Sequence, residues 1–168
     1  MATQVSSLIG ANLNTASSDA TALFALGTVA IGTDGTRWEY VQATATFITG
    51  ELVFISPNGT GKTLISSLFT LNADGYDIAA CQGLINQGEN GWVAKQGRKL
   101  YVLCTGTITL AGNAYGVGLG ANSGRLVLGA SAGVGETMFG IYLTSATPDP
   151  SGQVVTQATL TWPRHVNT

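Results

Sequence analysis

The feature that most constrains the fold is a series of short apolar runs separated by glycine-containing turns. Strand-forming residues alternate with polar ones in some runs and are continuous in others, and both patterns are typical of strands. The expected strands are Thr28–Ile31, Thr36–Gln42, Glu51–Ile55, Gly91–Ala94, Leu100–Thr107, Arg125–Leu128, Met138–Thr144 and Val154–Trp162. Several short strands at this spacing predict an all-β protein, a single-domain β-barrel or sandwich.

Two segments carry helical signals. Ser17–Leu26 predicts a short helix with Gly27 as its stop. In Asp77–Gln87 the apolar residues fall at helical spacing, but Ile78–Gln82 is equally compatible with a buried strand. Both interpretations of the second segment stay open at this point.

Turn chemistry marks the connections. Gly32-Thr33-Asp34-Gly35 predicts a hairpin turn. Lys95 to Arg98, next to Lys99 and Trp92, is interpreted as a solvated turn between two strands rather than as a phosphate contact. We expect Trp92 and Trp162 in the core, because large aromatic side chains dominate buried surface.

The stretch SPNGTGKT ends like a phosphate-binding loop but departs from that motif. Ser56 stands where the first glycine is needed, and Pro57 removes one N–H donor from the phosphate cradle. The following residues favour a strand and not the helix that such a loop precedes. We therefore predict a surface turn over Ser56–Gly61 and no nucleotide binding.

Charge is scarce in this chain of 168 residues, a length that favours one domain. Only 10% of the residues are charged, against about a quarter in typical domains. Either other protein subunits cover much of the surface, or Thr, Ser and Asn coat it. The net charge of −2 argues against a nucleic-acid partner, which calls for a basic patch.

Residues 1–22 differ from the remainder and predict an extended N-terminal arm, with residues 23–168 forming the β domain. The arm has no basic residue and no sustained apolar block, so it does not resemble a secretory signal. Nor does the uncharged stretch 100–124 predict a membrane span, because asparagines and glycines interrupt it. The arm has too little apolar surface to fold alone, and we expect contacts outside its own barrel. The residues expected to make these contacts, with a partner protein or with a neighbouring copy, are Val5, Leu8, Ile9 and Leu13.

Residues for catalysis or metal binding are few. Cys81 and Cys104 have no metal-type spacing and are interpreted as two buried free thiols, with a disulfide still compatible with the sequence. His165 is the only histidine. Of the acids, Glu39 and Glu51 lie on expected strands while the aspartates mostly fall in turns. We predict no enzyme, no cofactor and no metal.

A carbohydrate-binding sandwich is an alternative. Trp38, Tyr40 and Trp92 are candidates for an exposed aromatic face that would bind sugars. The competing interpretation, which we favour, places the same three side chains in the core.

Three stretches together resemble a known class of proteins. They are TVAIGTDGTRWEYVQATATFITGELVFI, GYDIAACQGLINQGENGWVAKQGRKLYV and VVTQATLTWPR. In this order they resemble the small β-rich head decoration (cement) proteins, and related virion structural proteins, of tailed bacteriophages. The matching residues are Asp34, Gly35, Trp38, Tyr40, Gln82, Gly91, Trp92, Val93, Gly97, Trp162, Pro163 and Arg164.

The resemblance implies a non-enzymatic protein that binds the outer surface of the phage capsid and stabilises it. It implies the major capsid protein and further copies of this chain as partners, with a homotrimer as the expected assembly. It also implies a location on the outside of the virion after synthesis in the host cytoplasm. Another virion component, such as a tail or head-fibre base protein, is the alternative within the same class.

Overall fold

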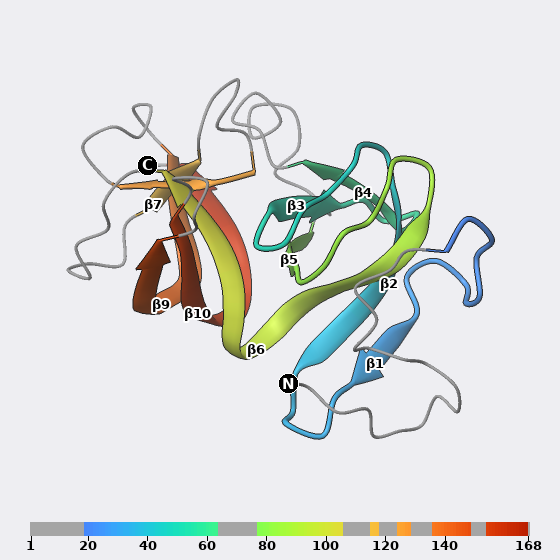
Figure 1. The fold of residues 1–168 in the computed structure, drawn as a ribbon, viewed down its shortest axis with the longest axis horizontal. Helices are drawn as coiled ribbons and strands as arrows, with labels where there is room; N and C mark the ends of the chain where they lie inside the picture. Colours follow the sequence, from blue (N-terminus) through green and yellow to red (C-terminus); the bar gives the residue numbers. More distant parts are fainter. Residues whose placement is uncertain are drawn as a thin grey trace.

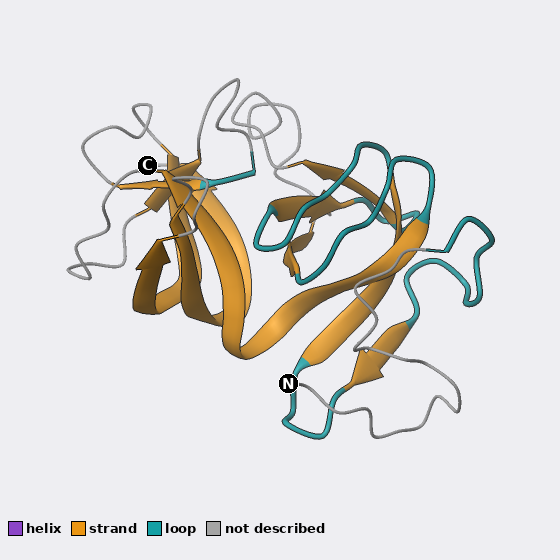
Figure 2. Ribbon diagram, viewed as in Figure 1, coloured by secondary structure: helices purple, strands orange, loops and turns teal. Residues whose placement is uncertain are grey.

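The computed structural model describes residues 19–63, 77–105, 115–117, 124–128, 136–148 and 154–167. All regular structure in this part is strand, and it contains no helix (Figure 2). The strands are β1 Val29–Ile31, β2 Arg37–Ala43, β3 Leu52–Ile55, β4 Thr60–Thr63, β5 Asp77–Cys81, β6 Asn90–Thr105, β7 Tyr115–Val117, β8 Leu126–Leu128, β9 Glu136–Pro148 and β10 Val154–Asn167. The prediction of an all-β fold is confirmed.

The strands form one sheet that closes on itself twice. The first ring runs β2–β4–β3–β5–β6 and is closed by the pairing of β6 with β2. The second runs β6–β10–β9–β7–β8 and is closed by the pairing of β8 with β6. Figure 1 shows β6 bent sharply, with β2 to β5 on one side and β7, β9 and β10 on the other. β6 is therefore the strand that both rings share.

Two bulges bend β6. Gln96 and Ala94 pair with the consecutive residues Arg37 and Trp38 of β2, so Lys95 is an extra residue. Further along, the pairs with β10 shift between Gly97 and Leu100, which adds a second extra residue. The predicted turn between two strands at Lys95–Arg98 is wrong, because β2 on one half and β10 on the other hold the chain extended through this bend.

Alternate residues of the central strands point into two separate cores. The ring core fills the first ring and comprises Val41, Ala43, Phe47, Val53, Ile55, Ala79, Cys81, Ile85 and Val93. The opposite faces of β2, β3, β5 and β6 join β8, β9 and β10 in the shared core, which includes Trp38, Leu52, Phe54, Ile78, Leu100, Val102, Leu126, Ile141 and Leu160. β3 and β5 are buried on both faces for this reason.

β1 and β4 lie end to end along one edge of β2. β1 pairs with Arg37 to Glu39, and β4 pairs in parallel with Gln42 and Ala43. The segments that lead into these two strands are in contact, Leu26 before β1 and Gly59 before β4. A Cβ on Gly59 would be 2.6 Å from Leu26 Cβ. Gly59 also has φ +78°, which favours glycine there.

The helical interpretations are not supported where the structure can test them. Residues 19–26 contain no helix, because backbone bonds tie this segment to two different strands: Asp19 to Asn90 of β6, and Gly27 to Tyr40 of β2. For the second segment, the structure gives β5 at its start, which is the strand alternative. Residues 1–18, with Val5, Leu8, Ile9 and Leu13, lie outside the described residues.

Candidate interaction surface

The outward face of β6, β10 and β9 carries two exposed tyrosines. Tyr101 of β6 is 44% exposed and Tyr142 of β9 is 46% exposed. β10 lies between them: Gln157 is opposite Tyr101, and Thr159 is opposite Tyr142. Residues directly opposite in an antiparallel pair share one face, so these four side chains form a single surface, here called the tyrosine face. It carries aromatic, amide and hydroxyl groups and no charge.

The opposite face of the same strands anchors this surface. Leu100 and Val102 stand on either side of Tyr101 in β6, and both belong to the shared core. In β9, Ile141 lies in the shared core and Leu143 packs against it, on either side of Tyr142. Buried neighbours therefore hold the two tyrosines in outward positions. They lie two strand spacings apart and are offset by two residues along the strands, which places their backbones about 12 Å apart.

Gln82 supports the tyrosine face from the edge of β6. Its Nε2 donates to the carbonyl of Tyr101 at 3.0 Å, and its Oε1 accepts the N–H of Tyr101 at 2.8 Å. The side-chain amide thus satisfies the Tyr101 backbone as a neighbouring strand would. Further along this edge, the N–H of Leu103 donates to the carbonyl of Gly50.

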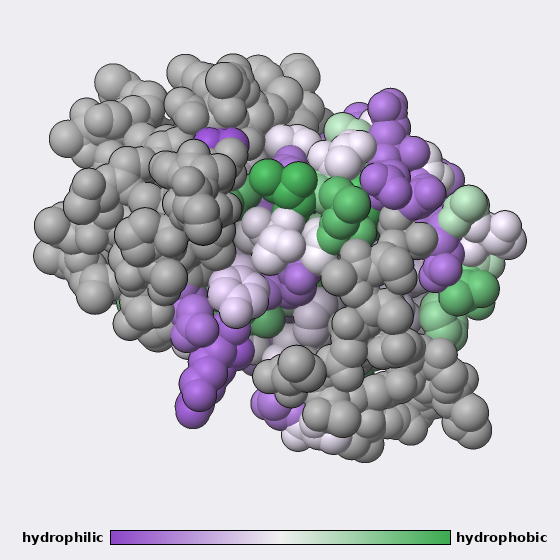
Figure 3. All heavy atoms as spheres, in the orientation of Figure 1, coloured by the Kyte–Doolittle hydropathy of each residue, from purple (hydrophilic) through white to green (hydrophobic). Residues whose placement is uncertain are grey.

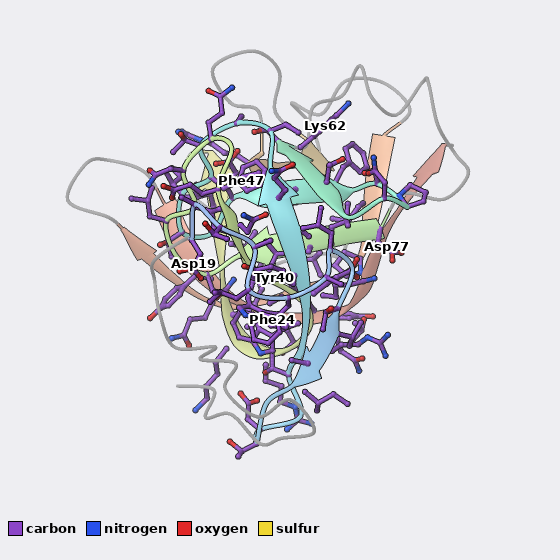
Figure 4. The ribbon with its side chains drawn as sticks, turned by 90° about the vertical axis from the view of Figure 1, so that its right-hand side faces the viewer. Asp19, Phe24, Tyr40, Phe47, Lys62 and Asp77 are labelled. Atoms are coloured by element: carbon purple, nitrogen blue, oxygen red, sulfur yellow. The ribbon has the colours of Figure 1, made fainter. Side chains whose placement is uncertain are left out.

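The three aromatic residues that the alternative interpretation assigns to a sugar-binding face do not form an exposed surface. Trp38 and Tyr40 are buried, and Trp92 is half-buried against the shared core. Phe24 packs on Tyr40 and Trp92 with ring centroids 5.3 and 5.4 Å apart (Figure 4). The N–H of Leu23 donates to the Tyr40 hydroxyl. The chain's own segment therefore covers these rings, which supports the core interpretation. The side chain of Trp162 lies outside the described residues.

A buried ion cluster closes one end of the ring core. Lys95 Nζ donates to Glu39 Oε2 at 2.8 Å and also to Asp77 Oδ2. Glu39 and Lys95 are almost fully buried, whereas the Asp77 side chain is more than half exposed. Each of the three residues stands two positions along its strand from a ring-core residue, and the two ion pairs join β6 to β2 and to β5. Lys95 is structural, and its predicted place in a solvated basic turn is wrong.

Glu51 is a second buried carboxylate, placed where both rings meet. Its Oε2 accepts the N–H of Ile48 at 3.0 Å, and Gly124 lies so close that a Cβ there would be 2.5 Å from Glu51 Cγ. Burial raises the pKa of this carboxyl, against smaller opposing effects from the Thr63 hydroxyl, the Ile48 N–H and the Arg125 charge. Glu39 and Glu51 lie in different clusters, so the structure does not bring the two strand-borne acids together as a pair.

The two cysteines are free and buried, as one of the two sequence interpretations had it. Cys81 belongs to the ring core and Cys104 to the shared core. Desolvation raises the pKa of each thiol to about 12, so neither is a ready nucleophile.

The glycine-rich stretch after β3 forms a turn, as the sequence predicts, but the turn ends before Gly61 because Thr60 and Gly61 belong to β4. The N–H of Gly59 donates to the carbonyl of Ser56, and the N–H of Ser56 to that of Thr60. Lys62 is exposed on β4 and pairs with Phe54 (Figure 4). The lysine is therefore part of a strand and not of a phosphate cradle.

Neither a metal-type cluster of side chains nor a membrane-type helix occurs in the described residues. No group of three or more His, Cys, Asp or Glu side chains in this part of the chain is arranged to hold a metal ion. Within the same residues, no helix has the length and hydropathy of a membrane span.

Further apolar side chains are exposed away from the tyrosine face. Phe47 and Ile85 form an isolated bridge with their side chains in the ring core, which places Ile48 opposite Leu84 on the outside. Both are exposed. Figure 3 shows apolar atoms at the centre and at the right-hand edge of one face, between polar groups. The described surface thus combines little charge with separated apolar groups.

Sequence reasoning missed the tyrosine face. The signal was present in the alternation Leu100-Tyr101-Val102 and Ile141-Tyr142-Leu143, where one aromatic residue stands between two apolar ones. What the sequence does not reveal is the register that brings both tyrosines to the same face across β10. Comparison of the chain with protein-family models, with curated proteins and with solved structures finds no match.

Proposed function

We propose that this chain is a non-enzymatic virion structural protein that binds the outer surface of a phage capsid and stabilises it. The observation that carries the proposal is the tyrosine face, an uncharged surface with two aromatic side chains fixed by the shared core. Tyrosine is enriched at protein interfaces because it buries a large area at a small cost in side-chain entropy. The resemblance of the three sequence stretches to decoration proteins supports the same conclusion.

The physical basis of such a function is burial of surface across neighbouring capsid subunits. A specific interface needs about 1,600 Å² in total, and the tyrosine face supplies its centre. Copies repeated over the shell add avidity against internal pressure. A homotrimer at a local threefold position is the assembly we propose, with the major capsid protein as the partner. The low content of charge, 10% of residues, is consistent with a surface that other subunits cover.

Co-sedimentation with capsids of the phage that encodes the chain tests this proposal. We expect the full chain to sediment with intact particles and the double variant Tyr101→Ala/Tyr142→Ala to bind at least tenfold more weakly, about 1.4 kcal/mol. Lys62→Ala, which removes an exposed side chain from a different strand, is the matched control and should bind as the unaltered chain does. Equal binding of all three proteins would exclude the tyrosine face, and no binding of the full chain would overturn the function.

A further inference from the structure

β1 offers an open edge. Among the described strands it pairs only with β2. The carbonyl of Thr28 accepts the N–H of Tyr40, and the N–H of Gly32 donates to the carbonyl of Thr36. Because backbone groups alternate in direction along an antiparallel strand, those of Thr28, Ala30 and Gly32 face β2. The N–H and C=O groups of Val29 and Ile31 therefore face away from the sheet.

This edge is short, but it lacks the other usual kinds of protection. Proteins guard free edges by keeping them short and by adding charged side chains, proline or bulges, because an unguarded edge pairs with other chains. Residues 20–33 contain no charged residue and no proline. β1 pairs with β2 without a register shift, so no bulge twists the edge away. Ile31 is 56% exposed on it. Such an edge is suited to pairing with another uncharged strand.

We propose that the occupant of this edge is β1 of a second copy, in antiparallel register centred on Ala30. This register places Val29 opposite Ile31 of the second copy and Ile31 opposite its Val29. These are the residues whose backbone groups face outward, so both pairs would be hydrogen-bonded. β-branched side chains opposite one another stabilise such pairs. The sequence Val-Ala-Ile is self-complementary about its centre, which favours a second copy over a charged partner.

The contact is small and therefore reversible. A ladder of three residues buries less than the roughly 1,000 Å² of a stable interface, so we expect dimerisation only at high concentration or where copies are held close together. The contact has twofold symmetry, and it is independent of the proposed capsid binding and of a threefold assembly. On a shell it would link neighbouring assemblies.

Sedimentation equilibrium of the full chain tests the contact. The smallest species should double its mass reversibly as the concentration rises. Ile31→Lys and Ile31→Glu should each weaken this association at least tenfold, because pairing with the second copy would remove water from the added charge at a cost in free energy. Thr33→Lys, which adds the same charge at the exposed hairpin turn, should leave the association unchanged. Unchanged association in both Ile31 variants would overturn the proposal, as would loss of association on deleting residues 2–18.

A cross-link tests the register. Opposite residues in a hydrogen-bonded pair have Cα atoms about 5.5 Å apart, within the range of a disulfide. Ala30 itself is buried in the shared core, so the cysteines are placed at its neighbours Val29 and Ile31. A mixture of Val29→Cys and Ile31→Cys proteins should give a mixed covalent dimer under mild oxidation, whereas either protein mixed with Thr33→Cys should not. The native thiols, which are buried and have pKa values of about 12, will not compete. A mixture of the first two proteins that stays uncross-linked at concentrations where the mass doubles would contradict the register.

Discussion

At the scale of single residues, the buried Lys95 is the charge with the largest predicted effect. It neutralises Glu39 inside the end of the first ring. Removing one partner of a buried ion pair leaves the other charge without compensation, which costs about 3–5 kcal/mol. We therefore expect Lys95→Met to lower the free energy of unfolding by this amount in urea denaturation. Lys62→Met, a matched change at an exposed lysine, should stay within about 0.5 kcal/mol. Similar losses in the two variants would mean that Lys95 is solvated.

Glu51 gives the pH dependence at this scale. Its pKa is raised in the folded chain, chiefly by burial, so the folded state holds the proton more tightly than the unfolded state. Stability from this group is present below the unfolded pKa and falls as the pH rises through the raised folded pKa. Glu51→Gln should therefore gain stability relative to the unaltered chain between acidic and neutral pH, as thermal melts at a series of pH values would record. A difference that is constant with pH would contradict the burial of this charge. Glu89→Gln, on a half-buried loop glutamate, serves as the control.

The thiols supply a third residue-scale prediction. With their pKa values near 12 and their side chains buried, Cys81 and Cys104 should react with a thiol reagent only after unfolding. Ellman's reagent at pH 8 should label neither in the native chain and both in guanidinium. Rapid labelling of the native chain would show that one core opens easily.

At the scale of elements, the bend in β6 depends on two residues with unusual backbone angles. A Cβ at Gly97 would lie 2.6 Å from Thr36 Oγ1, so we expect Gly97→Ala to cost about 1–3 kcal/mol. Lys99 is exposed and has φ 55°, a conformation that costs a non-glycine residue energy. Lys99→Gly should therefore gain up to about 1 kcal/mol despite the added glycine entropy. In urea denaturation, a lower free energy of unfolding for Gly97→Ala and a higher one for Lys99→Gly would support the bulged bend. A loss of stability in both variants would contradict it.

The N-terminal arm expected from the sequence has a prediction of its own. Deleting residues 2–18 spares the bridge between Asp19 and Asn90. We expect the melting temperature to stay nearly unchanged while capsid binding weakens at least tenfold, because Val5, Leu8, Ile9 and Leu13 are lost as contacts. Binding of the truncated chain at full strength would make the arm a tail without a role.

The sequence predicts those strands whose position is determined by local pattern. β1, β2 and β3 appear close to the expected ranges, because alternation and the Asp34-Gly35 turn are local signals. The sequence predicts two strands in place of β6, because Gly97 and its basic neighbours are typical of a turn. Pairing with β2 and β10 keeps the strand continuous instead. The helix expected before Gly27 is absent because Phe24 covers Tyr40 and Trp92 instead. Long-range pairing decided each of these differences, and a single sequence does not reveal it.

At the scale of the whole molecule, the shared strand links the two rings. The shared core takes side chains from strands of both rings, and β6 supplies residues to both cores. Residues of the shared core support the outward surface of β6, β10 and β9 from below, which suits the proposed binding to a larger surface. We propose that this tyrosine face binds the outside of a capsid.

Electron cryomicroscopy of capsids with and without saturating amounts of the full chain tests that claim most directly. We expect added density on the outer surface at repeated positions, with Tyr101 and Tyr142 turned toward the shell. Density confined to a tail or fibre base would favour the other virion role. Capsids that show no added density, or added density in which the tyrosine face points to solvent, would contradict the proposed binding.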